Sequence, residues 1–155
     1  MKFLITKELH HNPLLKVLIL FFVAILTLFL FSDILIYHYQ IGLTPTLAEE
    51  CLRGDIETYT EPILFDVLLE RVHISIFTSM ITLMLLSIIY MRVYNIEKSF
   101  VIHLGFISAI LSPIALILSY FYGNIFIVLW ISSFLFWHMI ALYFSFRIFL
   151  GLLIR

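Results

Sequence analysis

The stretch LILFFVAILTLFLF, residues 18–31, decides the fold, because it is apolar on every side and carries no charge. It lies in an apolar run over residues 14–36 with no charged residue between Lys16 and Asp33. A helix needs roughly 20 apolar residues to cross a bilayer core, whereas membrane-barrel strands alternate in polarity. The run therefore predicts a membrane-spanning helix. It has no small-residue cleavage site, so we expect it to be retained rather than removed as a signal peptide.

The composition of the whole chain points the same way. Of its 155 residues, 63% are hydrophobic and 12% are charged, whereas soluble domains have about 45–50% and about 25%. A formal net charge of −1 argues against a nucleic-acid-binding surface. A single cysteine argues against a disulfide framework or a CxxC motif. These features predict an integral membrane protein that contacts the lipid bilayer and no nucleic acid.

Three more apolar runs follow the first. We predict spans over residues 14–36, 64–91, 100–121 and 125–146, with an external loop over residues 37–63. The expected fold is all-α, an integral membrane four-helix bundle that forms a single transmembrane domain over residues 1–155. In the loop, Thr46-x-x-Glu49 matches a capping box, which marks the start of a helix. Gly54 is a residue type that commonly ends a helix. A short amphipathic external helix is therefore expected between spans one and two, with Leu47, Cys51 and Leu52 against the membrane surface or the bundle mouth.

Charged residues set the expected orientation, because cytoplasmic loops are enriched in Lys and Arg. The opposite side of the bundle carries only Arg53 and Arg71, so both termini are predicted to be cytoplasmic (N-in/C-in). The cytoplasmic side would hold Lys2, Lys7, Lys16, Arg92, Lys98, Arg147 and Arg155. The external side would hold a set of acids that forms either a solvated loop or a docking surface for a basic partner: Glu49, Glu50, Asp55, Glu57, Glu61, Asp66 and Glu70.

Ionisable residues inside spans are costly, so each is a candidate functional residue. They are Asp33, Glu70, Arg71, His73, His103 and His138. A b-type haem in a helical bundle needs two imidazoles at matched depth on facing helices. At about 1.5 Å per residue, His138 matches either His103 or His73 in depth, whereas those two do not match each other. The predicted haem site is His138 with His103 or His73, and Arg71 near the outer mouth would hold an anionic group such as a propionate.

Neighbouring residues would complete that site. Phe134, Phe136 and Trp137 flank His138, and Gly105 would let a flat macrocycle approach. The alternative is that each histidine hydrogen-bonds a neighbouring helix. Asp33 is expected to form a structural ion pair with Arg71, and Glu70 to accept a hydrogen bond from His73.

A metal stripe on the second span is another hypothesis. Its members, His73, Met80, Met84 and Met91, share one helix face at 100° per residue. Imidazole and thioether ligands together suit Cu(I). The alternative is that these methionines fill gaps in the core.

Two expectations concern the interior of the bundle. Pro113 predicts a kink in the third span, with Ser112 bonding the freed carbonyl. Spans one and four are apolar all round, so no clear polar interior face is expected, which argues against an aqueous channel.

Three motifs within residues 42–77 carry a resemblance to a family. They are Gly42-Leu43-Thr44-Pro45, Arg53-Gly54-Asp55 and Leu68-Leu69-Glu70-x-x-His73. In this order they resemble small, mostly uncharacterised four-helix inner-membrane proteins of proteobacteria, in which a second histidine follows two residues later where this chain has Ser75. The resemblance implies a bacterial cytoplasmic (inner) membrane. The layout is also similar to that of four-helix b-type cytochromes.

Three functions are compatible with these observations. The first is a haem-binding redox or sensing subunit of a bacterial membrane complex, which would pass electrons to quinone or to other membrane-protein subunits. The second is a non-catalytic accessory subunit of a transporter or respiratory complex. The third is a copper conduit or chaperone. The chain shows no serine–histidine–acid set, phosphate-binding glycine loop or HExxH motif, so we do not expect an enzyme that acts on its own.

Overall fold

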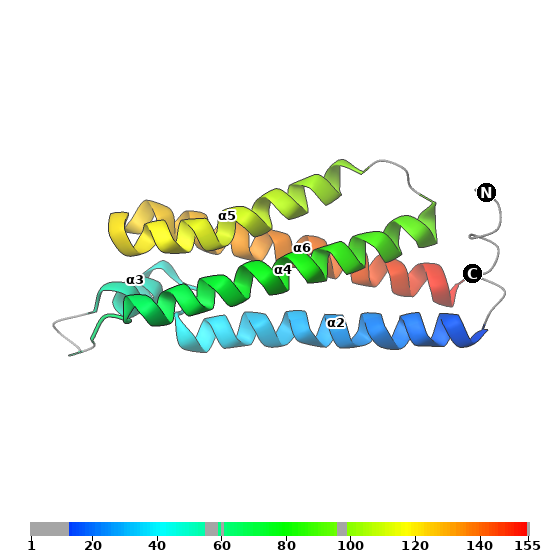
Figure 1. Ribbon diagram of the computed structural model, residues 1–155, viewed down its shortest axis with the longest axis horizontal. Helices are drawn as coiled ribbons and strands as arrows, with labels where there is room; N and C mark the ends of the chain where they lie inside the picture. The colour runs from blue at the N-terminus through cyan, green and yellow to red at the C-terminus, as the bar shows by residue number, and fades with distance from the viewer. Residues whose placement is uncertain (1–12, 55–58, 60, 96–98, 155) are drawn as a thin grey trace.

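A computed structural model describes residues 13–54, 59, 61–95 and 99–154 of the chain. It contains four long helices and one short one (Figure 1), and the described residues form no strand. The helices are α2 (Pro13–Gln40), α3 (Pro45–Arg53), α4 (Phe65–Tyr94), α5 (Phe100–Tyr122) and α6 (Asn124–Leu153). The four long helices have the length and composition to cross a membrane. The prediction of an all-α four-helix membrane bundle with a short extra helix is confirmed.

All four long helices continue past the apolar runs that predicted them, and three of them do so by three or more residues. Helix α2 ends at Gln40, α4 at Tyr94 and α6 at Leu153, whereas the runs end at residues 36, 91 and 146. Backbone hydrogen bonding does not stop where hydropathy falls, so a helix continues into polar and aromatic residues at the interface. The extra turn at the end of α2 changes the depth of every residue on that helix.

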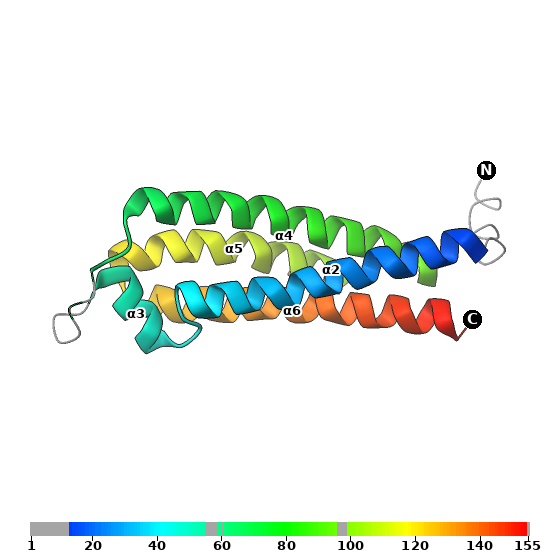
Figure 2. The same ribbon diagram turned by 90° about the horizontal axis from the view of Figure 1, so that it is seen from below.

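Helix α6 is the centre of the bundle, because it packs against each of the other four helices. Helix α2 lies along α6 (Figure 2) and buries only Val23, Leu30 and Tyr37, which are spaced seven residues apart. A seven-residue repeat produces a narrow seam between two helices. Most of the surface of α2 therefore faces away from the bundle.

The core consists of two clusters along the bundle axis. One surrounds Trp137 and Phe144, in the half of the bundle near the termini. The other surrounds Trp130 and Phe134 and includes Leu52 of α3. Helix α3 therefore covers the mouth of the bundle with Leu52, while Leu47 is exposed.

The start of α3 differs from the prediction. Its N-cap is Thr44, whose Oγ1 lies 3.4 Å from the backbone nitrogen of Leu47. The predicted capping box at Thr46 and Glu49 is wrong by two residues. Pro45 takes the first helical position, where its missing N–H costs nothing and its fixed φ suits the helix. Gly54 caps the C-terminal end, as predicted.

The interior is more polar than predicted. The expectation of no clear polar interior face is wrong, because α4, α5 and α6 bury hydroxyls between them. Four of these nine hydroxyls bond a carbonyl three or four residues back on their own helix, so hydropathy averages do not reveal them. Small residues also let helices approach closely. The buried polar residues are Ser75, Ser79, Thr82, Ser87, Ser108, Ser112, Ser119, Ser133, His138 and Ser145.

Pro113 lies inside α5, and the helix turns away from the rest of the bundle over its N-terminal half (Figure 1). The predicted role of Ser112 is wrong. Its hydroxyl is buried and has no hydrogen-bond partner in the described part of the chain.

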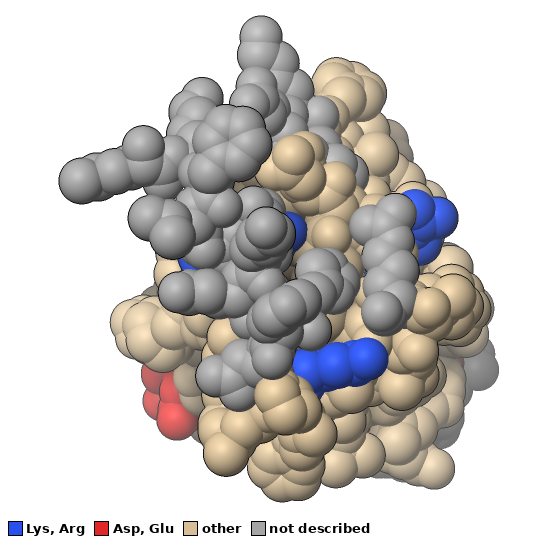
Figure 3. Space-filling view, turned by 90° about the vertical axis from the view of Figure 1, so that its right-hand side faces the viewer, with Lys and Arg blue, Asp and Glu red and all other residues tan. Residues whose placement is uncertain are grey.

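The start of α2 and the end of α6 lie at one end of the bundle, the termini end, and α3 lies at the other (Figure 1), which is the arrangement that the predicted topology requires. Basic side chains are visible at the termini end (Figure 3). Of the residues behind the sidedness argument, Lys2, Lys7, Lys98 and Arg155 lie outside the described residues, as do Asp55 and Glu57 of the acidic segment. Which end is cytoplasmic stays a prediction.

Candidate functional site

A buried carboxyl–imidazole pair joins α2 to α6. The Nε2 atom of His138 lies 3.1 Å from Oδ2 of Asp33. The His138 side chain is 1% exposed and that of Asp33 is 16% exposed. The other ring nitrogen, Nδ1, lies 2.8 Å from the backbone oxygen of Phe134. Both ring nitrogens of His138 therefore have a polar partner.

The carbonyl partner of His138 fixes the position of one of its protons. A carbonyl oxygen only accepts hydrogen bonds, so Nδ1 carries a proton and donates it to Phe134. A hydrogen bond between Nε2 and Asp33 then needs one further proton, which sits either on the carboxyl or on the imidazole. The pair is thus a neutral acid beside a neutral imidazole, or a carboxylate beside an imidazolium. In both forms one shared proton holds α2 against α6.

Aromatic rings surround this pair. The Phe134 ring centroid lies 4.2 Å from that of His138, and the Trp137 ring centroid 3.7 Å from it. Such an apolar setting strengthens electrostatic interactions and makes an unpaired charge costly.

The predicted ion pair of Asp33 with Arg71 is wrong. Asp33 contacts His138, whereas Arg71 donates a hydrogen bond to the Oε1 atom of Gln40. The reason is depth. Asp33 lies seven residues before the end of α2 at Gln40, about 10 Å along the helix, so it sits well inside the bundle.

The structure does not bring the other two histidines to His138. His73 and His103 are exposed on the outside of the bundle, whereas His138 is buried. On α4 the inward position is Ser75 rather than His73. No hydrogen bond joins Glu70 to His73 in the described part of the chain, contrary to expectation.

The space at Gly105 serves packing between helices. A Cβ placed there would meet Cγ2 of Ile140 at 3.2 Å and Cδ2 of Leu83 at 3.6 Å. This glycine lets α6 and α4 approach α5 and leaves no gap beside it for a flat ligand. Phe136, another predicted wall residue, is exposed.

The residues of the metal stripe lie in different surroundings. Met80 packs against the core, Met84 is 47% exposed, and His73 is exposed. Among the residues that the structure describes, no group of three or more His, Cys, Asp or Glu side chains is placed to hold a metal ion. Copper binding by His73, Met80, Met84 and Met91 stays a prediction.

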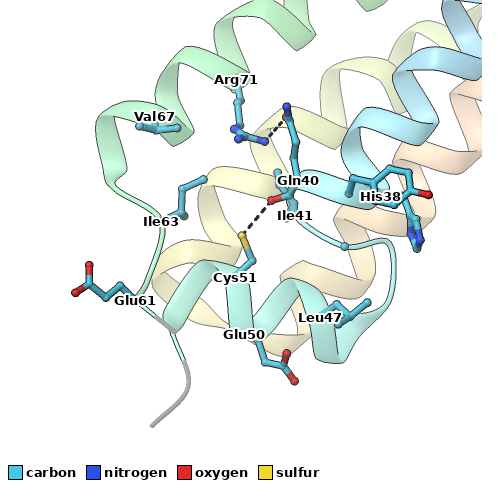
Figure 4. A pocket seen from close by; sticks show the side chains of 12 residues that line it. His38, Gln40, Ile41, Leu47, Glu50, Cys51, Glu61, Ile63, Val67 and Arg71 are labelled. Carbon is cyan, nitrogen blue, oxygen red and sulfur yellow. Dashed lines mark hydrogen bonds between the residues drawn. The ribbon is translucent and has the colours of Figure 1, made fainter. Parts of the chain in front are cut away.

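An open pocket of about 620 Å³ lies at the α3 end of the bundle (Figure 4). It is bounded by the end of α2, by α3 and by the start of α4. Arg71 and Cys51 both contact Gln40: Arg71 bonds its side chain, and the Cys51 thiol lies 3.4 Å from its backbone oxygen. The volume is typical of a small-molecule site. Sequence reasoning missed the pocket, because its walls come from three separate segments.

The Cys51 thiol is expected to react slowly with iodoacetamide at neutral pH and faster as the pH rises. Only the thiolate attacks, and burial raises the pKa of Cys51 while the positive charge of Arg71 partly opposes that rise. Alkylation rates across neutral and alkaline pH test this, since Cys51 is the single cysteine of the chain. Arg71→Gln should slow the reaction further. A neutral-pH rate equal to that of glutathione would contradict the prediction.

Helix α3 is held in place by the turn between α5 and α6. Gly123 has a φ of +89°, and a Cβ there would lie 2.7 Å from the Arg53 guanidinium. With its amide turned to donate, the Asn124 nitrogen lies 2.9 and 3.0 Å from the two carboxylate oxygens of Glu49. These contacts fix the wall of the pocket that α3 provides.

A family model described as a transmembrane helical domain matches residues 42–155, more than two thirds of the chain. The match covers α3 to α6 and begins just after α2. His138 lies inside the matched region and Asp33 lies before it. The comparisons with curated proteins and with solved structures give no match.

Proposed function

Because the chain belongs to the Aq_1264_TM family of transmembrane helical domains, we propose that it is a membrane-embedded subunit that takes up and releases a proton at the Asp33–His138 pair. The observation that carries this proposal is the contact of 3.1 Å between two titratable side chains inside the bundle. Ionisable groups at membrane depth commonly mark ion pathways and proton relays. The cytoplasmic membrane of a bacterium is the proposed location, on the resemblance of residues 42–77.

The chemistry of the pair supports a proton as the bound species. Because Nδ1 of His138 donates to the Phe134 carbonyl, only Nε2 and the two carboxyl oxygens of Asp33 are left to bind an ion. A zinc ion needs about four ligands and calcium about six to eight oxygens, which is more than the pair provides. A proton needs only one acceptor, and Asp33 and His138 already share one.

Protonation of such a site has a function only when it is coupled to another reaction, such as electron transfer or the transport of a substrate. We therefore propose that the chain acts with other membrane subunits, in a redox or transport complex, as a non-catalytic accessory subunit. The acidic side chains at the α3 end remain a proposed docking surface, although Glu49 also faces Asn124.

Infrared difference spectroscopy of the purified protein, recorded across a pH titration, tests the proton site. We expect a protonated-carboxyl signal that changes with pH, that is lost in Asp33→Asn and that is altered in His138→Gln. Glu70→Gln is the matched control, because Glu70 is an exposed acid on a neighbouring helix. A wild-type spectrum that matches Asp33→Asn at every pH would overturn the proposal.

A b-type haem is the second candidate, favoured by the aromatic rings of Phe134 and Trp137 around His138. For His138 to bind the iron, its Nε2 atom would have to give up the hydrogen bond to Asp33 and coordinate the metal instead. The second ligand would be His103 or His73 after a helix rearrangement, with Arg71 near a propionate and quinone as an electron partner.

An optical spectrum of gently purified, haem-supplied protein, oxidised and then reduced with dithionite, separates the two candidates. Haem predicts a b-type spectrum that is lost in His138→Ala and kept in His38→Ala, because His38 is exposed at the end of α2. A featureless spectrum from folded protein would remove the haem candidate and leave the proton site untouched.

A further inference from the structure

We infer that the pocket at the α3 end binds an ethanolamine phospholipid, with Arg71 against the phosphate and with Glu50 and Glu61 toward the ammonium group. The inference is independent of the proposed proton site, because Asp33 and His138 are not among the pocket residues. It assigns a ligand to the cavity of about 620 Å³ that lies between the end of α2, α3 and the start of α4 (Figure 4).

Arg71 is the cation of the pocket. A guanidinium carries several N–H donors in a planar fork, and its Nη1 atom donates to the Oε1 atom of Gln40. Among the residues that the structure describes, no carboxylate lies within ion-pair distance of Arg71. The side chain is partly buried, so an anionic ligand would replace water that the pocket walls exclude in part. The guanidinium fork matches a phosphate group, whose oxygens accept two parallel hydrogen bonds.

The two carboxylates of the pocket lie farther out along the bundle than Arg71. Glu61 precedes the start of α4 at Phe65, whereas Arg71 lies six residues after that start, about 9 Å along the helix. Glu50 is on α3, which covers the mouth of the bundle. Figure 4 shows the same order, with Arg71 on α4 and both glutamates toward α3 and the loop that follows it. A ligand in the pocket therefore meets a cation on the membrane side and two anions nearer the water.

This order of charges matches one class of phospholipid. In an ethanolamine phospholipid the phosphate is next to the glycerol, and the ammonium lies at the outer end of the headgroup. An ammonium has three N–H donors and carboxylates accept hydrogen bonds, so Glu50 and Glu61 can bind it directly. The trimethylammonium of a choline headgroup has no N–H donor. A headgroup without an amine would place its negative charge beside two carboxylates, which repel it.

Apolar side chains continue from the pocket toward the centre of the membrane. On α2, Ile36 precedes Gln40 by four residues, and on α4, Ile74 follows Arg71 by three. Each isoleucine therefore lies one helical turn deeper on the same side of its helix as the polar residue. Ile36 is 48% exposed and Ile74 is 52% exposed. The acyl chains of a phospholipid would lie along these side chains, a contact that a free headgroup compound cannot make.

Titration of the delipidated protein with phospholipids, followed by native mass spectrometry, tests the inference. We expect phosphatidylethanolamine to bind at least about tenfold more tightly than phosphatidylcholine or phosphatidylglycerol with the same acyl chains, because one charge-assisted hydrogen bond corresponds to about one to two powers of ten in Kd. Arg71→Gln should weaken the binding of phosphatidylethanolamine by about tenfold or more for the same reason. Arg92→Gln is the matched control, because Arg92 is exposed at the opposite end of α4. Gln40→Ala removes the same hydrogen bond within the protein but keeps the guanidinium, so it should bind like the wild type.

The double variant Glu50→Gln with Glu61→Gln tests the ammonium end of the headgroup. It should lose the preference for phosphatidylethanolamine over phosphatidylcholine and keep the affinity for phosphatidylcholine, because the phosphate contact at Arg71 remains. Asp66→Asn is the matched control, because Asp66 is an exposed acid at the start of α4 that is not among the pocket residues. Neither glutamate is part of the buried core, so this variant keeps the inference testable if Arg71→Gln does not fold.

Protection of Cys51 from alkylation locates the ligand and identifies its source, because Cys51 lines the pocket. Phosphatidylethanolamine should slow the alkylation more than phosphatidylcholine does at the same concentration. Glycerophosphoethanolamine and inorganic phosphate, which have no acyl chains, should protect less. Equal protection by glycerophosphoethanolamine would indicate a site for a soluble phosphate compound and overturn the lipid assignment. Equal Kd values for the three phospholipids, or an unchanged Kd in Arg71→Gln, would overturn the inference while the proton site stands.

Discussion

Replacement of Asp33 by alanine is expected to lower the free energy of unfolding by about 1–3 kcal/mol, the cost of leaving a buried hydrogen-bonding atom unpaired. The variant removes the partner of Nε2 on a His138 side chain that is 1% exposed, so water cannot take its place. Breaking a buried ion pair costs about 3–5 kcal/mol, but His138 can release its proton and avoid an unpaired charge. Polar contacts between membrane helices average about 0.6 kcal/mol and reach about 1.7 kcal/mol, because the unfolded chain finds other partners. The burial of His138, whose side chain is 1% exposed, places this pair in the upper part of that range or above it.

Unfolding in mixed micelles with a denaturing detergent, followed by helical circular dichroism, measures this loss. Asp66→Ala is the matched control, because Asp66 is an exposed acid at the start of α4, and surface changes usually stay within about 0.5 kcal/mol. The double variant Asp33→Ala with His138→Ala should be more stable than the sum of the single losses predicts, because no unpaired partner remains. Equal stability of Asp33→Ala and Asp66→Ala would show that the pair does not hold α2 to α6.

Most of the fold could be predicted from the sequence, because a bilayer imposes one simple requirement on it. Apolar runs such as residues 18–31 can only be helices in lipid, and their number and order define the bundle. The short helix α3 was predictable from Gly54 and from its amphipathic pattern. Its start was not, because both Thr44 and Thr46 have the side chain of an N-cap, and the choice depended on Pro45.

The site was harder to predict, because it depends on how deep each helix sits. Asp33 and His138 were both recognised as ionisable residues in spans, but Asp33 was assigned to Arg71. A helix end misplaced by four residues shifts a side chain by about 6 Å, enough to exchange one partner for another. The spacing of Val23, Leu30 and Tyr37 was the signal that could have shown which side of α2 faces α6.

Replacement of Gly42 by alanine is expected to cost about 2–6 kcal/mol, because two separate penalties of about 1–3 kcal/mol each add. Gly42 has a φ of +92°, which strains any other residue, and a Cβ there would lie 2.4 Å from the Cβ of Leu47. Its backbone N–H also donates to the Tyr37 carbonyl at 3.1 Å, which ends α2 and fixes the direction of the chain toward α3. To relieve the clash, the first turn of α3 must move away from α2, and the pocket between them must open.

Gly105→Ala is the contrasting variant, because Gly105 is in a helix and its added Cβ meets only the side chains of Ile140 and Leu83, at 3.2 Å and 3.6 Å. Alanine gains about 1 kcal/mol of helix propensity over glycine, which offsets the tighter packing, so its net change should stay within about 1 kcal/mol of zero. The two variants are compared by unfolding in mixed micelles and by the alkylation rate of Cys51. We expect Gly42→Ala to be much less stable and its Cys51 to react faster, because α3 no longer closes over Gln40. If both variants unfold at the same detergent composition and their thiols react at the wild-type rate, then the turn at Gly42 does not position α3, and the pocket does not depend on it.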